Sequence, residues 1–332
     1  MMETVLLTGS NGFLGSHLVK KLLSKYKVIG TVRSKDKGEN LVQELKQDSQ
    51  LNIGNFQWEI WELTDQASLE KILKKYKISK IVHSAAPYDF GIKNFVDNVI
   101  NPIIKGMEIL ISVIKTYPVT HFVLTSSSQC HYNLDQYSNE DFILTEKTWC
   151  SYNYEEAVEN PFKAYHYAKT QSEILYWNFI NSSASIIGCA ISPFFMFGPQ
   201  PFDSRCLKRL NTPNELFNII LRCGPDDLSK IPNLFGYVSD VRDIAELHFK
   251  ALEHEKLQNK ILLPFSGIFS CAEILNLAKD SFRQLNLPPK TFTEIILFKV
   301  VSNTNGLIDF ELTNPNQTIF DSLNQIVLTK NL

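Results

Sequence analysis

The chain has 332 residues, 44 % apolar and 20 % charged, which is ordinary for a globular protein and enough for one large α/β domain or a domain with an added lobe. Its formal net charge of -2 gives no reason to expect nucleic acid or an anionic membrane as a partner. No apolar run reaches the ~18 residues that a membrane span needs. A strand-like run begins at residue 3, so we expect no signal or transit sequence and a cytoplasmic location. The cysteines are widely spaced, which favours reduced thiols.

The first 130 or so residues alternate between strand-like and helix-like segments. In chain order we predict a strand at 4–8, a helix at 13–26, a strand at 27–32, a helix at 38–48, a strand at 56–61, a helix at 66–76, a strand at 81–87, a helix at 98–116 and a strand at 121–127. This alternation predicts an α/β fold of the Rossmann type, with a doubly wound parallel sheet and right-handed connections.

The pattern changes after Pro193, where loops rich in Pro, Gly and Asn separate shorter helices, predicted at 214–223 and 243–253. We therefore expect a Rossmann domain over residues 1–193 and a smaller C-terminal lobe over residues 194–332. Some late segments of the lobe are expected to return to the sheet.

The first predicted strand meets the first helix at GSNGFLG, which contains Gly9, Gly12 and Gly15. Gly9 permits a tight turn, Gly12 has no side chain where a pyrophosphate would approach the backbone, and Gly15 lets helix and strand pack closely. The amide hydrogens and positive dipole end of the helix favour a phosphate. A glycine motif alone is a weak signal, but a strand before it and a striped helix after it predict dinucleotide binding.

The second strand ends in VRSKDK, where NAD-preferring sites carry an acidic residue for the ribose 2′-hydroxyl. Here Arg33 occupies that position, and Lys37 follows one helical turn later. A guanidinium forks onto phosphate oxygens and an ammonium adds a point charge, so we predict NADP(H) as the cofactor. The alternative is two solvated cations at a helix start. Glu62 and Leu63, at the end of the third strand, are expected beside the adenine.

Two tyrosine–lysine pairs have the four-residue spacing that puts both side chains on one helix face, Tyr76–Lys80 and Tyr165–Lys169. Ligands of such sheets bind beyond the carboxyl ends of the strands. Tyr76 and Lys80 come just before the fourth strand, which is the wrong edge. Tyr165 and Lys169 follow the fifth strand in a helix-compatible run, so we expect them at the site. Tyr167 is then a residue of the core or of the pocket wall.

Ser126 and Ser127 lie at the carboxyl end of the fifth strand, facing the same crevice. One serine, Tyr165 and Lys169 suit the reduction of a carbonyl group, which takes a hydride on carbon and a proton on oxygen. A tyrosine with its ordinary pKa of ~10 donates poorly at neutral pH, but a neighbouring ammonium lowers that pKa. A serine hydroxyl stabilises the charge that develops on oxygen. No HExxH motif or Cys/His cluster occurs, so we expect no metal.

These motifs, in this order, resemble those of the extended short-chain dehydrogenases/reductases. Within that family the chain resembles the dihydroflavonol-4-reductase-like branch, which includes fungal NADPH-dependent methylglyoxal and aldehyde (carbonyl) reductases. The resemblance runs over nearly the whole chain and rests on VLLTGSNGFLGSHLV, KVIGTVRSKDK, IVHSAAP, FVLTSSS, NPFKAYHYAK, FMFGPQPFD, LNTPNELFN and GYVSDVRDIAELH. The chain departs from the family pattern at Ala168, where serine is usual, at Ser192, where asparagine is usual, and at Glu62, where aspartate is usual. Near the C-terminus it lacks the family's Leu-Gly-aromatic stretch before the last helix, which NPNQTIFDSLNQIVL retains alone.

The resemblance implies that Ser127, Tyr165 and Lys169 are the catalytic residues. The cofactor-binding residues that it implies are Gly9, Ser10, Asn11, Gly12, Phe13, Leu14, Arg33, Lys37, Glu62, Leu63, Tyr165, Lys169, Pro193, Met196 and Pro213. Residues 1–193 would bind NADP, and the C-terminal lobe would mainly bind substrate. Tyr132 and Phe90 are candidates for the pocket wall.

The resulting hypothesis is NADPH-dependent reduction of aldehydes and ketones by a monomer or homodimer, with Tyr165 as the proton donor. Methylglyoxal-like α-dicarbonyls, small or branched aldehydes and prochiral ketones are the expected substrates. One alternative is a nucleotide-sugar epimerase or dehydratase, which shares the glycine turn and the Tyr–Lys pair but usually keeps NAD bound, so Arg33 argues against it. The other is a sensor or scaffold that binds NADP without turnover, and the intact Ser127, Tyr165 and Lys169 argue against that.

Overall fold

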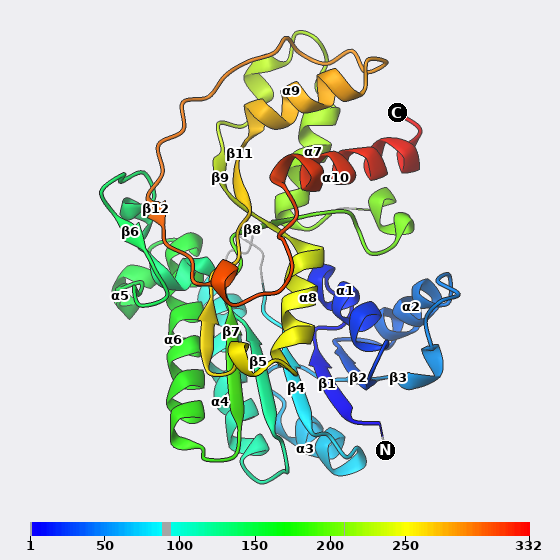
Figure 1. The fold of residues 1–332 in the computed structure, drawn as a ribbon, viewed down its shortest axis with the longest axis vertical. Coiled ribbons are helices and arrows are strands. Elements are labelled where there is room, and N and C mark those ends of the chain that lie inside the picture. The colour runs from blue at the N-terminus through cyan, green and yellow to red at the C-terminus, as the bar shows by residue number, and fades with distance from the viewer. Residues whose placement is uncertain (1, 88–93, 209) are drawn as a thin grey trace.

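The computed structural model describes residues 2–87, 94–208 and 210–332. Within them, seven parallel strands form a central sheet in the order β10-β7-β5-β4-β1-β2-β3 (Figure 1). These strands are β1 Thr4–Thr8, β2 Lys27–Val32, β3 Phe56–Ile60, β4 Lys80–His83, β5 His121–Thr125, β7 Ile187–Ile191 and β10 Lys260–Leu262. The strand order reverses between β1 and β4, and ligands of such sheets bind at that reversal. The predicted doubly wound α/β fold is confirmed.

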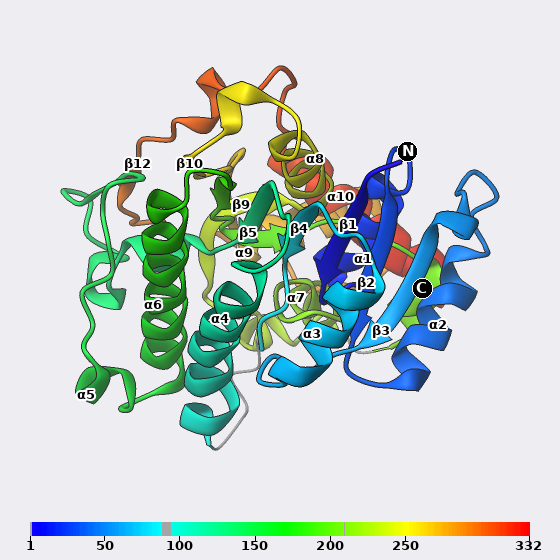
Figure 2. The ribbon, with the colours of Figure 1, turned by 90° about the horizontal axis from the view of Figure 1, so that it is seen from below.

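Helices cover both faces of the sheet because successive side chains of a strand point to opposite sides. Val5 and Leu7 of β1 belong to one buried cluster, and Leu6 belongs to another. Helices α1 Phe13–Leu22, α2 Lys35–Leu45 and α8 Val241–Ala251 pack in the first cluster. The second cluster includes α3 Gln66–Lys75, α4 Asn101–Ile114 and α6 Pro161–Ser182. Figure 2 shows α4 and α6 side by side on one face of the sheet, with α8 on the other.

Several predicted helix boundaries differ from the structure. The helices predicted at 214–223 and 243–253 run over Thr212–Leu221 and Val241–Ala251. The first helix ends at Leu22 instead of residue 26, and Tyr26 is buried with its hydroxyl donating to Glu253. The second runs over Lys35–Leu45 instead of 38–48. The segment predicted as one helix over 98–116 begins as a π-helical turn and continues as α4 from Asn101. Pro102 lies at this change. A proline has no amide hydrogen to donate, so the α-helical hydrogen-bond pattern is interrupted near it.

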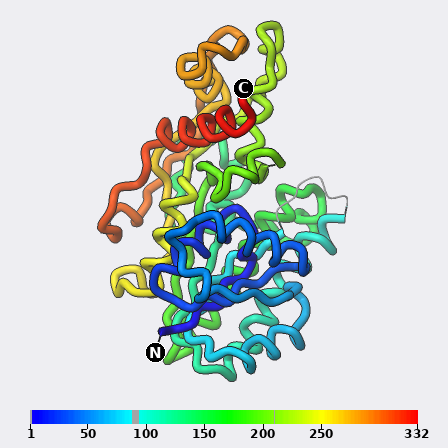
Figure 3. Tube along the Cα trace, turned by 90° about the vertical axis from the view of Figure 1, so that its right-hand side faces the viewer, coloured from blue at the N-terminus to red at the C-terminus, as the bar shows by residue number. Residues whose placement is uncertain are grey.

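The C-terminal part builds a second layer of structure above the carboxyl edge of the sheet (Figure 3). Strands β8 Phe195–Phe197, β9 Phe235–Asp240 and β11 Gly267–Ser270 form a small sheet, against which α7 Thr212–Leu221, α9 Cys271–Ser281 and α10 Pro315–Lys330 bury a separate core. The remaining elements are α5 Tyr154–Ala157 and the paired strands β6 Ile143–Leu144 and β12 Lys299–Val300. β10 pairs with β7 in the large sheet, and α8 packs against that sheet. The division at residue 194 stays a prediction.

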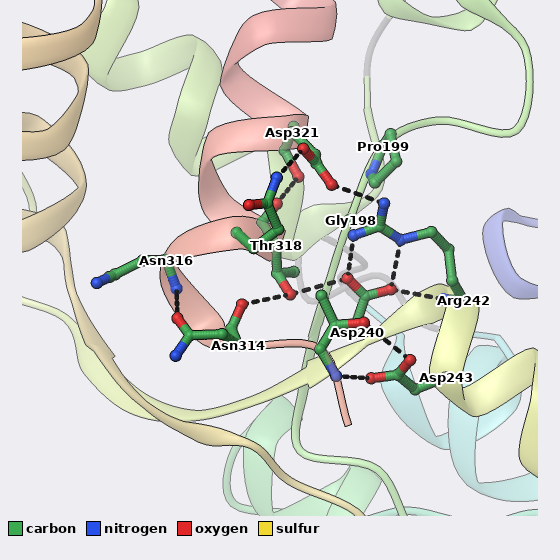
Figure 4. Close-up of polar contacts among 12 residues, drawn as sticks. Gly198, Pro199, Asp240, Arg242, Asp243, Asn314, Asn316, Thr318 and Asp321 are labelled. Carbon is green, nitrogen blue, oxygen red and sulfur yellow. Dashed lines mark hydrogen bonds and ion pairs between the residues drawn. The ribbon is translucent and has the colours of Figure 1, made fainter. Parts of the chain in front are cut away.

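A polar network fastens α10 to the end of β9 (Figure 4). Arg242 binds the buried carboxylate of Asp240 through Nε at 3.0 Å and Nη2 at 2.6 Å, and it reaches Asp321 of α10 through Nη1 at 2.6 Å. The hydroxyl of Thr318 donates to Asp240 at 2.8 Å. Two-pronged guanidinium–carboxylate contacts are among the stronger polar contacts, so this network holds the last helix in register. Among the described residues, no helix combines the length and apolar character needed to traverse a bilayer.

Candidate active site

A cavity of about 800 Å³ opens beyond the carboxyl ends of the central strands. Its walls come from the segments that follow β1, β2, β3, β4 and β5, and from the C-terminal lobe. The volume falls within the range of cofactor and small-molecule sites. The cavity therefore occupies the crevice at which the strand order predicts ligand binding.

The glycine turn between β1 and α1 lines one end of the cavity. Gly9 has a positive φ of 70°, which disfavours residues with a side chain, and a Cβ there would lie 3.0 Å from Ala85. A Cβ on Gly15 would lie 2.1 Å from the carbonyl oxygen of Gly9. The loop can thus close tightly on α1, whose N-terminus begins directly after Gly12. This glycine-rich loop at a helix N-terminus fits a dinucleotide pyrophosphate.

Arg205, in a 3₁₀ turn of the C-terminal lobe at Asp203–Leu207, holds the back of this loop. Its Nη1 donates to the carbonyl oxygens of Asn11 at 3.2 Å and Gly12 at 3.4 Å. Its Nε and Nη2 bind the carboxylate of Glu44 on α2. The sequence carries no local signal for this contact, because Arg205 and Asn11 lie 194 positions apart.

Arg33, Glu62 and Leu63 line the end of the cavity beyond β2 and β3. Lys37 lies outside the lining, but burial and the nearby charge of Arg33 lower the pKa of Lys37, while Glu62 opposes that shift. Arg33 and Lys37 are therefore close enough to feel one another's charge, and an anion between them would relieve the repulsion.

Ser10 is the other predicted cofactor residue outside the lining. Its buried hydroxyl donates to the carbonyl oxygen of Thr31 at 3.0 Å, and its carbonyl accepts from the hydroxyl of Ser16. The side chain of Ser10 thus ties the glycine turn to β2. Asn11, Phe13 and Leu14 line the cavity with the glycines.

Ser127, Tyr165 and Lys169 meet at the wall beside β5. Tyr165 and Lys169 lie one turn apart on α6, so both face the cavity. Lys169 Nζ donates to the carbonyl oxygen of Thr125 at 2.8 Å, and burial lowers the pKa of Lys169. The hydroxyl of Ser127 accepts from the amide of Gln129 at 3.2 Å, which starts the 3₁₀ turn Ser128–His131.

The two neighbouring serines have different partners. The hydroxyl of Ser126 donates to the buried carboxylate of Glu173. The same hydroxyl lies 3.2 Å from Cys130 Sγ. Ser127 instead keeps a local bond to the backbone. This difference favours Ser127 over Ser126 as the serine that faces a ligand.

The other tyrosines of the two motifs lie away from the cavity lining. The hydroxyl of Tyr76 donates to Glu59 at 2.7 Å, and Lys80 binds the carbonyl oxygen of Leu252 at 3.0 Å. Tyr167 is half-buried and meets the ring of Tyr154 edge-on, with ring centres 6.2 Å apart. The order of strands predicted that Tyr76 lies at the edge of the sheet away from the cavity. The helical spacing predicted that Tyr167 lies on a different face of the helix from Tyr165 and Lys169.

The cavity lining also includes Pro193, Met196, Pro213 and Tyr132, all predicted. Phe90, the other pocket-wall candidate, lies outside the described residues. Two of the departures from the family pattern, Ala168 and Ser192, are buried. Ala168 packs in the cluster of α4 and α6, and Ser192 Oγ lies 3.3 Å from His131 Nε2.

Several lining residues escaped the sequence analysis, namely Ser84, Asp97, Asn98, Tyr137, Phe194 and Tyr237. The hydroxyl of Tyr137 donates to the carbonyl oxygen of Phe235 at 2.6 Å, and that of Tyr237 donates to Phe298. Both hydroxyls thus bond to the backbone. Ser84 and Tyr237 fall in segments that the sequence analysis quoted, IVHSAAP and GYVSDVRDIAELH, so those motifs were the available signal.

A parallel doubly wound sheet, a glycine turn and a serine–tyrosine–lysine wall on one cavity define an extended short-chain dehydrogenase/reductase. Residues 5–263 match the NAD dependent epimerase/dehydratase family, and the chain belongs to that family.

The chain is similar to named proteins over its whole length. It is 28 % identical over 342 residues to the NADPH-dependent methylglyoxal reductase GRE2 of Saccharomyces cerevisiae, covering 98 % of each chain. The crystal structure of Gre2 with NADPH from Candida albicans is 30 % identical, with a TM-score of 0.90 over 98 % of this chain and 99 % of the other. The yeast methylglyoxal/isovaleraldehyde reductase Gre2 complexed with NADPH is 28 % identical, with a TM-score of 0.91 over 99 % of both.

Proposed function

We propose that this chain reduces the carbonyl group of aldehydes and ketones to an alcohol, with NADPH as the hydride donor. Methylglyoxal-like α-dicarbonyls, small or branched aldehydes and prochiral ketones are the proposed substrates. The observation that carries the proposal is the lining of one cavity, with Ser127, Tyr165 and Lys169 at one wall and the glycine turn and Arg33 at another. The similarity to Gre2 proteins named as NADPH-dependent reductases supports it.

Tyr165 is the proposed proton donor to the carbonyl oxygen. The ammonium of Lys169, one helical turn away, stabilises the phenolate that Tyr165 leaves behind and so lowers the cost of the proton transfer. The bond from Lys169 to the carbonyl oxygen of Thr125 holds the ammonium at this wall. Ser127 binds the same carbonyl oxygen and stabilises its developing negative charge.

NADPH supplies the hydride when bound. Gly9–Leu14 would hold its pyrophosphate through backbone amides, and Arg33 with Lys37 would hold the 2′-phosphate. Glu62 and Leu63 would lie beside the adenine, and Pro193, Met196 and Pro213 would position the nicotinamide. The exposed guanidinium of Arg33 at the cavity is the feature that favours NADPH over NADH.

The family also contains epimerases and dehydratases, and the test must separate these from a reductase. Purified protein is mixed with NADPH and a panel of methylglyoxal, branched and aromatic aldehydes, diketones and a prochiral ketone, and NADPH oxidation is followed by its near-ultraviolet absorbance. We expect oxidation with NADPH, much less with NADH, and none with Tyr165→Phe. Tightly bound cofactor without net consumption would instead indicate an epimerase, and NADPH binding without any turnover would indicate a sensor.

A further inference from the structure

Glu173 is a buried carboxylate directly behind the proposed catalytic wall. It lies on α6 one turn after Lys169, and its exposed fraction is 0 %. Its two oxygens accept bonds from the hydroxyl of Ser126 and from Trp177 Nε1, the latter at 3.1 Å. A buried ionised carboxylate is costly unless it is hydrogen-bonded and balanced by a positive charge.

The ionisable groups around Glu173, Lys169 and Thr125 leave one candidate for that positive charge. His83 of β4 and His248 of α8 are buried, and burial lowers their pKa to about 3 and about 4. Burial raises the pKa of Cys130, Cys189 and Tyr176. All five groups are therefore neutral between about pH 5 and pH 9.

Lys169 is the cation that remains among these described neighbours. It is 5 % exposed, and burial lowers its pKa while Cys130 and then Glu173 act to raise it. A buried ammonium without a counter-ion loses its proton as solvation is removed. Lys169 can stabilise a phenolate only while it is protonated.

A hydrogen bond from the hydroxyl of Ser126 also connects Glu173 to the catalytic wall. Ser126 lies between Thr125, whose carbonyl binds Lys169, and Ser127. The amide of Ser126 donates to Ile191 at 2.7 Å, and the amide of Ser128 donates to Pro193 at 3.0 Å. Glu173 holds the hydroxyl of Ser126, and backbone carbonyls hold the amides of Ser126 and Ser128. The segment 125–128 is therefore fixed, together with the Thr125 carbonyl and the Ser127 hydroxyl.

We propose that Glu173 is a positioning residue of the reductase, whose carboxylate acts as the counter-ion of Lys169 and, through Ser126, orients the Thr125 carbonyl and Ser127. The inference rests on the proposed function for its catalytic meaning. The counter-ion role of Glu173 does not depend on turnover, so it can be tested by titrating Lys169 in the cofactor-free protein.

The first experiment titrates Lys169 in the cofactor-free protein by NMR of ¹³Cε-labelled lysine, with the signal assigned by Lys169→Arg. Removing a neighbouring negative charge lowers the pKa of a cation, so Glu173→Gln is expected to lower the Lys169 pKa by about one pH unit or more. Ser126→Ala keeps the charge and is expected to leave that titration within a few tenths of a unit. An unchanged Lys169 titration in Glu173→Gln overturns the counter-ion role.

The second experiment measures pH profiles of NADPH-dependent reduction for the same variants. For Glu173→Gln we expect the alkaline limb of kcat/KM to move to lower pH, with the Kd for NADPH unchanged. For Ser126→Ala we expect kcat to fall several-fold at every pH without a shift of the limb. A normal kcat in Ser126→Ala overturns the orienting role.

The outcomes separate the inference from the proposed function. If the unaltered protein reduces no carbonyl, the proposed function fails while the Lys169 titration still tests whether Glu173 acts as its counter-ion. If Glu173→Gln does not fold, ¹³C-carboxyl NMR of Glu173 in the unaltered protein decides the matter. An ionised Glu173 across pH 5 to 9 supports the counter-ion role, and a protonated one in that range overturns it.

Discussion

Arg205 and Glu44 form a two-pronged ion pair, with Nε to Oε1 at 3.0 Å and Nη2 to Oε2 at 2.6 Å, that joins the C-terminal lobe to α2. The same guanidinium donates to the carbonyl oxygens of Asn11 and Gly12. A loop that turns its amides toward a phosphate turns carbonyls the other way, and Arg205 satisfies these carbonyls. The lobe therefore supports the proposed pyrophosphate cradle from behind.

Arg205→Met should weaken NADPH binding about tenfold, because hydrogen bonds from a charged group contribute about 1.5–3 kcal/mol and only part of that support reaches the cofactor. Binding of adenosine 2′-monophosphate, which has no pyrophosphate, should be unchanged. Isothermal titration calorimetry measures both. Glu44→Gln is the matched control, since it leaves the loop contacts possible and should have a smaller effect. Equal weakening of both ligands would contradict the proposed support of the loop.

Tyr165→Phe should lower kcat by roughly a hundredfold or more, the usual contribution of a positioned proton donor. The Kd for NADPH should stay near normal, because the ring remains in place. Tyr167→Phe is the control, since Tyr167 is half-buried two positions further along the same helix and lies outside the cavity lining. Near-normal turnover in Tyr165→Phe, or equal losses in the two variants, would assign the proton donor elsewhere.

Arg33→Asp should raise the Kd for NADPH by about ten- to a hundredfold, because a charge-assisted bond to the 2′-phosphate is replaced by repulsion. NADH has no such phosphate, so its binding should change far less. Fluorescence titration with both nucleotides measures the ratio. Arg222→Asp, at an exposed position outside the cavity lining, controls for a general charge effect. An equal loss for NADH and NADPH would remove the 2′-phosphate role.

The free energy of unfolding should fall as the pH is lowered from 6.5 toward 4. His83, His166 and His248 are buried, and burial lowers their pKa to about 3, 4 and 4. The unfolded chain binds protons at these histidines below pH 6.5, whereas the folded chain does so only near pH 4. Each histidine thus contributes a slope of about 1.4 kcal/mol per pH unit in that window.

Urea unfolding between pH 7.5 and pH 5 measures this dependence. His166→Gln should give a visibly shallower dependence, because one of the histidines whose pKa burial lowers is gone. A dependence parallel to that of the unaltered protein would show that His166 does not titrate differently in the folded and unfolded states.

Thr318→Val should lower the free energy of unfolding by about 1–2 kcal/mol, because it leaves buried Asp240 with one acceptor site unfilled. Thermal unfolding followed by circular dichroism measures the loss. Asn316→Ala, at an exposed position two residues earlier on α10, should change stability by less than about 0.5 kcal/mol. Equal Tm values for the two variants would mean that the network in Figure 4 contributes little to holding α10.

The order of strands and helices, the glycine turn, and the pairing of Tyr165 with Lys169 could all be predicted from the sequence. Each depends on residues close together in the chain, where the helical and strand periods show which side chains share a face. Helix ends were less predictable, as at residues 23–26, because Tyr26 is held by distant Glu253 instead of by the helix.

Only the tertiary structure decided which of the two serines reaches Glu173, which lobe residue supports the glycine turn, and that Tyr137 and Tyr237 share a cavity with residues of the β1 turn. The first two of these relations join residues 47 and 194 positions apart, and no local period records such distances. They arise when the two buried faces of the sheet and the separate core of the lobe close against one another. The sequence by itself determined the chemistry available to the site, and packing determined which groups meet there.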